Sequence, residues 1–206
     1  MKRTKNPEYL LRVFIFSTLT CVIICSTKNC YAALGDIIKQ FNAPFLGSRG
    51  LAWDGSFLWH SDSGTDLIYK IDPATGNVLD SFATANINPN TLTFVDGELW
   101  NRDIFDRTFH SVDPSVGPPW NSEFGDSKDK YGITYDGNNL WISNATDDVI
   151  EKTDLDGNIL NTFNTPGIGP NDLAWDGNYL WLGDTNTDTI YKLDPANGNV
   201  LDSFSA

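Results

Sequence analysis

A repeat of about 40 residues constrains the fold of this chain more than any other feature of its sequence. "LAWDGSFLW" at 51–59 returns as "LAWDGNYLW" at 173–181. Trp59, Trp100, Trp141 and Trp181 follow one another at intervals of 41, 41 and 40 residues. The last unit also repeats the first almost letter by letter, with "IYKLDPANGNVLDSF" for "IYKIDPATGNVLDSF". A fixed period of this size is typical of repeat architectures, so the chain is predicted to consist mainly of four copies of one unit.

Each unit is predicted to form four short antiparallel strands. An Asp-Gly pair between two apolar runs marks a hairpin, because Gly adopts a positive φ at no steric cost. In three units a later Asp-Pro-x-x-Gly marks a second tight turn, which the third unit shortens to Asp154-x-Asp156-Gly157. No segment after residue 32 has helical periodicity. Four-stranded units at this spacing predict an all-β fold, a β-propeller or partial propeller, with blades at 47–82, 88–124, 129–163 and 169–204.

The segment before the first blade resembles a fifth copy of the fourth strand. "GDIIKQF" at 35–41 matches "GNVLDSF" at 76–82, yet no other strands of a blade accompany it. We therefore expect a four-blade piece of a larger ring, or a half-ring that associates into a homodimer. A closed ring of four blades is the alternative. In each case the second-strand tryptophans are expected to be largely buried between neighbouring blades.

The first 32 residues have the layout of a secretory signal peptide. A basic start precedes an apolar run at 13–25, and small residues precede a cleavage site near Ala32 and Ala33. An apolar run of this length is too short to span a bilayer as a helix. We therefore expect a secreted or periplasmic protein whose propeller domain occupies 33–206. All three Cys lie in the leader, so stability after cleavage depends on the core rather than on disulfides.

The charge of the domain restricts its partners. Residues 1–32 hold five of the 14 Lys and Arg and one of the 27 Asp and Glu, so residues 33–206 have a formal charge of −17. Such a charge argues against nucleic acids and anionic membrane surfaces. It is compatible with cations, amines, neutral polar ligands or a protein partner.

The stretch "GPNDLAWDGNYLWLGDTNTDTIYKLDPANGNVLDSF" at 169–204 resembles the blades of bacterial secreted propellers of the YVTN and NHL type. It is also similar to the blades of virginiamycin B lyases, and the resemblance extends over residues 33–206. It implies a propeller but no particular activity, because such blades occur in binding modules, scaffolds and enzymes. In the lyases the resemblance implies a His and acidic groups near the central axis. His60 is the one plausible equivalent, and its neighbours do not match that pattern.

Strand direction places the loops between the second and third strands on one face, with the loops that link blades. We call this the loop face. Its candidate ligand-binding residues occupy equivalent positions in successive copies or depart from the repeat, and they are Asp62, Asp66, Arg102, Asp103, Arg107, Asp148, Asp184 and Asp188. The two arginines could pair with carboxylates or select an anionic group. Function in repeat proteins commonly lies on such variable loops.

Asp184, Asn186 and Asp188 alternate like the first ligands of a calcium loop, although Thr189 replaces the usual Gly and no bidentate Glu follows. Turn formation explains these residues equally, because Asp and Asn accept hydrogen bonds from nearby amides. We therefore expect no cofactor, with calcium as the alternative. The sequence favours a secreted, non-enzymatic binding module. A lyase or hydrolase that acts at the central funnel, or a truncated propeller without activity of its own, is the alternative.

Overall fold

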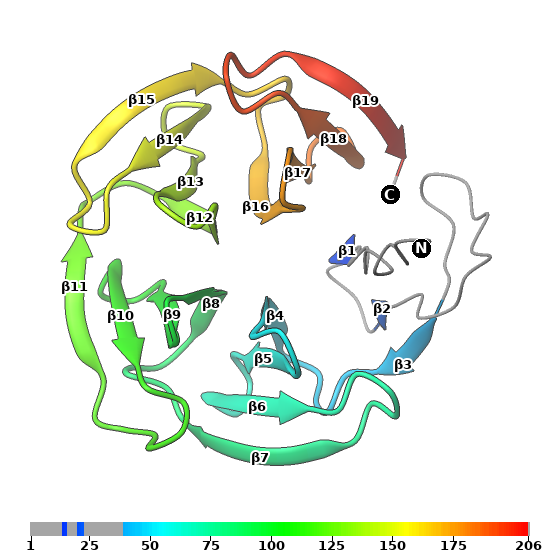
Figure 1. The fold of residues 1–206 in the computed structure, drawn as a ribbon, viewed down its shortest axis with the longest axis vertical. Coiled ribbons are helices and arrows are strands. Elements are labelled where there is room, and N and C mark those ends of the chain that lie inside the picture. Colours follow the sequence, from blue (N-terminus) through cyan, green and yellow to red (C-terminus); the bar gives the residue numbers. More distant parts are fainter. Residues whose placement is uncertain (1–13, 16–19, 23–38, 206) are drawn as a thin grey trace, which may run out of the picture.

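The computed structural model describes residues 14–15, 20–22 and 39–205. It confirms the predicted all-β fold, with four four-stranded antiparallel sheets arranged as the blades of a propeller and an extra N-terminal strand. The first strand of each blade lies nearest the central axis and the fourth lies at the periphery (Figure 1). Among the described residues, no helix is long and apolar enough to cross a membrane.

The blades follow one another around the ring in chain order. Blade 1 contains β4 (Ser48–Trp53), β5 (Leu58–Asp62), β6 (Leu67–Ile71) and β7 (Val78–Ala83). Blade 2 contains β8 (Pro89–Val95), β9 (Glu98–Asp103), β10 (Thr108–Val112) and β11 (Asn121–Gly125). Blade 3 contains β12 (Lys130–Tyr135), β13 (Leu140–Asn144), β14 (Val149–Thr153) and β15 (Ile159–Asn164). Blade 4 contains β16 (Pro170–Trp175), β17 (Leu180–Asp184), β18 (Thr189–Leu193) and β19 (Val200–Ser205).

The extra strand, β3 (Gln40–Asn42), takes the place of a fourth strand that precedes blade 1. The Phe41 ring lies against Gly76, just as Phe124 lies against Gly157 and Phe163 against Gly198. Residues 35–38 of the predicted strand lie outside the described residues.

Two strands from the predicted leader join this extra strand. β3 pairs with β2 (Thr20–Val22), which pairs with β1 (Phe14–Ile15). Leader cleavage, which would remove these two strands, stays a prediction.

The Asp-Gly turns fix the blade hairpins and also hold the tryptophans. Gly55 and its equivalents have φ between 95° and 102°, which confirms the predicted hairpin chemistry. In three blades the indole Nε1 of the second-strand Trp donates to the turn aspartate, at 2.7 Å for Asp54 and 2.8 Å for Asp136 and Asp176. Blade 2 has no such bond in the described residues, because its Asp-Gly is shifted by one position along the chain.

The core lies between blades rather than within them. Trp59, Trp100 and Trp141 are each at most 5% exposed and pack with aliphatic side chains of the following blade. Trp181 differs from the prediction, because it is only partly buried and packs with Ile190 and Phe204 of its own blade. The inner strands contact each other in the order β4, β8, β12 and β16, and the described residues show no comparable contact between β16 and β4.

We call the two blade faces that lack this contact the seam. One is the face of blade 4 with Trp181 and Ile190, and the other is the face of blade 1 with Trp53, Leu58 and Tyr69. In Figure 1 these faces lie on either side of the sector that contains β1 and β2. Among the described residues, blades 2 and 3 therefore pack against another blade on both sides, and blades 1 and 4 on one side.

Candidate functional site

The loop-face aspartates at the ends of the second strands stabilise their own loops. Asp62 is fully buried, and its carboxylate accepts hydrogen bonds from the amides of Gly47, Gly64 and Thr65 at 2.9, 2.9 and 3.0 Å. Asp184 is 3% exposed and likewise accepts from the amides of Gly169, Asn186 and Thr187. These carboxylates have the surroundings of turn formers rather than of groups that await a ligand.

The other loop-face candidates follow the same plan. Asp103 accepts from the Phe105 amide at 2.7 Å, while its second oxygen is buried without a hydrogen-bond partner, and burial raises the pKa of this carboxyl. The residues that close the four loops all have positive φ, which Asp tolerates better than most residues, and they are Asp66 (55°), Arg107 (61°), Asp148 (55°) and Asp188 (48°). The positive φ at this position alone explains why three of the four loops have Asp there.

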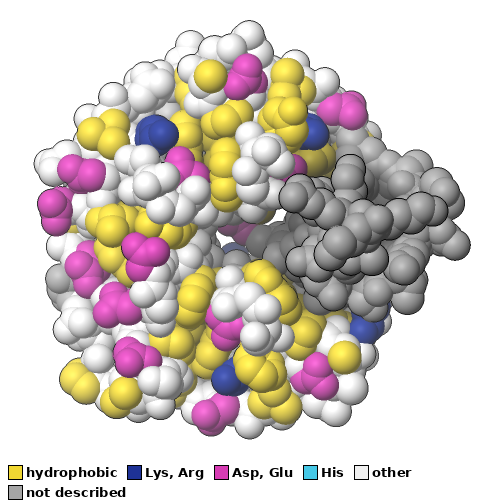
Figure 2. All heavy atoms as spheres, viewed as in Figure 1, with side chains coloured by type: hydrophobic (Ala, Val, Ile, Leu, Met, Phe, Trp, Pro, Cys, Tyr) yellow, Lys and Arg dark blue, Asp and Glu magenta, His cyan; other side chains and the backbone are white. Residues whose placement is uncertain are grey.

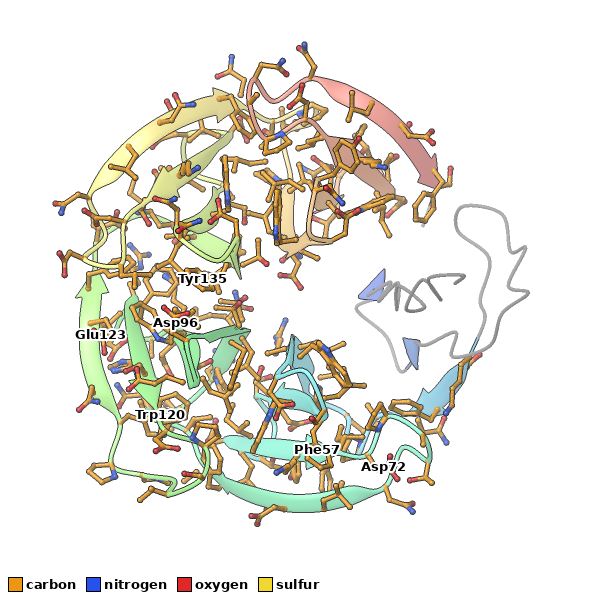
Figure 3. All side chains as sticks on the ribbon, in the orientation of Figure 1. Phe57, Asp72, Asp96, Trp120, Glu123 and Tyr135 are labelled. Carbon is orange, nitrogen blue, oxygen red and sulfur yellow. The ribbon has the colours of Figure 1, made fainter. Side chains whose placement is uncertain are left out.

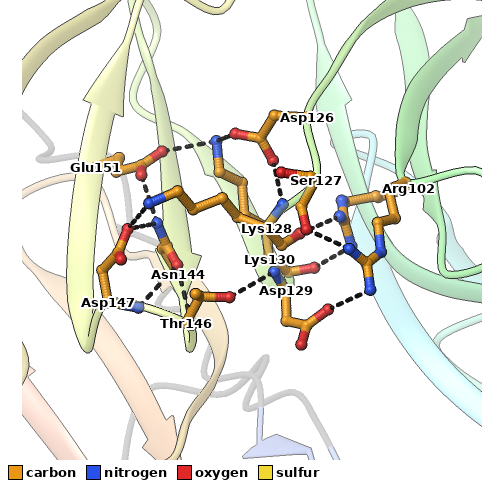
Figure 4. A network of polar contacts seen from close by, with 11 residues as sticks. Arg102, Asp126, Ser127, Lys128, Asp129, Lys130, Asn144, Thr146, Asp147 and Glu151 are labelled. Carbon is orange, nitrogen blue, oxygen red and sulfur yellow. Dashed lines mark hydrogen bonds and ion pairs between the residues drawn. The ribbon is translucent and has the colours of Figure 1, made fainter.

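Arg102 and Arg107 join blade 2 to blade 3. Arg102 is 2% exposed, and its guanidinium donates to the carbonyls of Lys128 and Lys130. Arg107 pairs with Asp129 at 3.1 Å and donates to the Ser127 carbonyl. The network continues through buried Lys130, whose Nζ lies 2.9 Å from Glu151 and 2.6 Å from Asp126 (Figure 4). Because all of these contacts are made within the protein, the two arginines have a structural role.

The predicted metal ligands are also engaged in the loop. Asp184 accepts the loop amides described above. The side chain of Asn186 donates to the Ile168 carbonyl at 3.2 Å, which fixes the same loop to the segment before β16. No group of three or more His, Cys, Asp or Glu that could hold a metal ion occurs in the described part of the chain.

A cavity of about 200 Å³ lies between the inner strands of all four blades and extends into the seam, where Leu58, Trp181 and Ile190 also line it. Figure 2 shows the hollow at the centre of the ring with hydrophobic side chains around it. One aromatic residue from each inner strand lines the cavity at the same repeat position, and these are Trp53, Phe94, Tyr135 and Trp175. Tyr135 also donates a hydrogen bond to Asp96 of blade 2 at 2.9 Å (Figure 3). The lining is thus mainly apolar, and aromatic at one end.

Asp172 is the one charged residue among the described residues that line the cavity. Its carboxylate accepts a hydrogen bond from the Leu173 amide at 2.9 Å. Asp172 is partly buried, and the hydration that its carboxylate loses raises its pKa to about 7, since no ion pair with a described cation replaces that hydration. A carboxyl group with this pKa beside an apolar cavity is a typical feature of a binding or catalytic site.

His60, which the lyase resemblance singles out, is packed in the blade 1 face of the seam. Its side chain is 3% exposed and stacks on Tyr69 with ring centroids 6.3 Å apart. Burial lowers its pKa to about 4, so the imidazole is neutral at neutral pH, and its Nε2 has no hydrogen-bond partner.

Comparison with known proteins supports the fold and leaves the activity open. No protein-family model and no curated protein matches the sequence. Among solved structures, Myxococcus xanthus glutaminyl cyclase is similar at TM-score 0.65 and 15% identity, over 78% of this chain and 71% of that chain. Staphylococcus aureus virginiamycin B lyase is similar at TM-score 0.55 and 18% identity, over 85% of this chain.

The match covers only 61% of that lyase chain. A third similar structure is a nidogen/laminin complex, with TM-score 0.60 and 20% identity over 85% of this chain and 70% of that one. These neighbours include enzymes and a non-enzymatic complex, and identities this low show a shared β-propeller fold alone.

Proposed function

We propose that this protein is an exported β-propeller that binds a small ligand in its central cavity without transforming it. The observation that carries the proposal is the composition of the cavity lining, in which five aromatic residues and a single carboxylate line one space. Apolar cavities with a few polar groups are the usual form of ligand sites. The sequence placed ligand binding on the loop face, but the carboxylates there are already bonded to loop amides.

The size of the cavity fits a compact aromatic or aliphatic group. A cavity of about 150 Å³ holds a benzene molecule, and this one has about 200 Å³. Thr93 and Thr134 add hydroxyl groups to the lining, so a ligand with a polar substituent can be accommodated. Export follows from the leader and is checked separately, because the intact mass of the exported chain reports whether it begins near Ala33.

The test of cavity binding is a ligand-observed NMR titration with benzyl alcohol, a neutral aromatic probe. Ala174→Phe places a ring in the cavity that Ala174 lines and is expected to abolish binding. Ala196→Phe adds the same ring to an exposed turn of the same blade and is expected to leave binding unchanged. Equal binding by the parent and Ala174→Phe, or no binding by the parent, would overturn the proposal.

A further inference from the structure

The four inner strands differ at one position, which lies three residues before the aromatic residue that lines the cavity. The four equivalents are Gly50, Thr91, Gly132 and Asp172, and blade 4 is the copy with a charge there. The paired positions on the second strands are Ser61, Arg102, Ser143 and Gly183. Blades 1 and 3 thus have Gly with Ser, blade 2 has Thr with Arg, and blade 4 has Asp with Gly.

The Gly–Ser pairs form close contacts with the next blade. A Cβ on Gly50 would lie 2.4 Å from the amide nitrogen of Leu92, and one on Gly132 would lie 2.6 Å from that of Leu173. Ser143 donates across the same interface to the Asn171 carbonyl at 2.7 Å. No side chain fits at the glycine position of these interfaces without displacing the neighbouring backbone.

The Thr–Arg pair of blade 2 shows how the same place is filled when the residue is larger. Thr91 lies opposite Arg102 in the sheet, and the Arg102 guanidinium occupies the space towards blade 3, where it binds two backbone carbonyls. Blade 4 has a negative charge on the inner strand instead of a positive charge on the second strand. Asp172 puts a carboxylate at the threonine position, and Gly183, opposite it in the sheet, puts no side chain at the arginine position.

The space beside Gly183 is open in the described structure. A Cβ built on Gly183 would have one neighbour within 4.0 Å among the described residues, the Asp172 carbonyl oxygen. Both residues line the central cavity. The site thus contains a carboxylate that forms no ion pair with a described residue, and a position that no described side chain fills, where blade 2 has a guanidinium.

We infer that the cavity selects a ligand with a cationic group, an ammonium, amidinium or guanidinium, which lies beside Gly183 and pairs with the Asp172 carboxylate. This inference rests on the proposed function and names the ligand class of the same cavity. The aromatic lining receives the body of the ligand, and aromatic faces also attract cations. The formal charge of −17 on residues 33–206 further favours the approach of a cation.

The experiment compares benzylamine with its neutral isostere benzyl alcohol by NMR titration at pH 8, where a carboxyl of pKa about 7 is ionised. Benzylamine is expected to bind about tenfold or more tightly than benzyl alcohol. Asp172→Asn should remove this difference. Asp202→Asn, which changes an exposed carboxylate on the outer strand of the same blade, should preserve it.

A second variant tests the pairing without any ligand. Gly183→Arg supplies a tethered guanidinium and is expected to raise the Tm and block benzylamine. Adding Asp172→Asn should cancel the rise in Tm. Equal affinities for the two probes, or a Tm rise that is independent of Asp172, would overturn the cation inference while cavity binding stands. Failure of both probes to bind would overturn the proposed function and the inference together.

Discussion

Removal of the indole at Trp141 or Trp181 measures how much the contact with a following blade contributes to stability. The two residues have the same local partners. Each indole donates to a turn aspartate at 2.8 Å, and each ring lies near a fourth-strand Phe, with centroids 5.9 Å apart for Trp141 and 6.5 Å for Trp181. They differ in what lies beyond, since Trp141 packs on the leucines of blade 4 and Trp181 faces the seam.

The size of the difference follows from buried area. Trp→Ala in a packed core costs about 3–5 kcal/mol, which is the expectation for Trp141→Ala. A following blade covers roughly one face of the ring, about 100 Å² of the 150–250 Å² that a Trp buries, which corresponds to about 2.5 kcal/mol. Trp181→Ala is therefore expected to cost about 2 kcal/mol less than Trp141→Ala.

Urea unfolding followed by far-ultraviolet circular dichroism gives both free energies, provided that the slope with denaturant is the same in the two variants. Equal losses would show that contacts within a blade dominate and that the following blade adds little. A Trp141→Ala midpoint equal to that of the parent would refute the core position of the repeated Trp altogether.

Three further outcomes are expected. The raised pKa of Asp172 means that the folded state holds a proton more tightly than the unfolded one, so stability falls as pH rises from about 4 to about 7, by at most about 4 kcal/mol. Asp172→Asn should flatten this part of the pH profile of urea unfolding. Gly132→Ala should cost about 1–3 kcal/mol in the same assay, while Gly183→Ala should be nearly neutral, and equal costs would contradict the close packing at Gly132. Millimolar calcium should leave the Tm unchanged in differential scanning fluorimetry because Asp184 already accepts loop amides, and a rise that Asp184→Asn abolishes would restore the metal site.

The repeat made the fold predictable because period and strand pattern recur in all four copies, and the turn chemistry recurs with small departures in the second and third copies. The Asp-Gly hairpins and the extra strand were predictable for the same reason, and Phe41 confirms the strand's register through its contact with Gly76. Trp181 is less buried than the other three second-strand Trp, because the described residues place no following blade against it, which the repeat pattern alone does not show.

The candidate site was harder to predict, because the repeat supplies many acidic residues with the same sequence signature. Asp62 and Asp184 have the spacing of functional loop residues, and only their bonds to backbone amides identify them as turn formers. Asp172 carried a usable signal, since it replaces Gly in the register of Gly50 and Gly132. Recognising that signal required the three-dimensional fact that these glycines contact the backbone of the next blade.

The close contact of Gly50 and Gly132 with the backbone of the next blade also changes the expected oligomeric state. The sequence favours a homodimer, yet a second copy docked on blade 4 in the manner of blades 1 and 2 would press its backbone against the Asp172 side chain, where Gly50 leaves room. β3 is a second obstacle, because Phe41 already takes the contact with Gly76 that a fourth strand of the preceding blade would make.

We therefore expect the parent to sediment as a monomer at micromolar concentration and physiological salt, and Asp172→Gly to associate more strongly. The variant removes both the steric obstacle and the desolvation of a carboxylate on docking. Asp202→Asn, which deletes one negative charge elsewhere on blade 4, controls for the change in net charge. If the parent were a dimer whose stability did not respond to residue 172, the seam would have to close through an interface unlike those at Gly50 and Gly132.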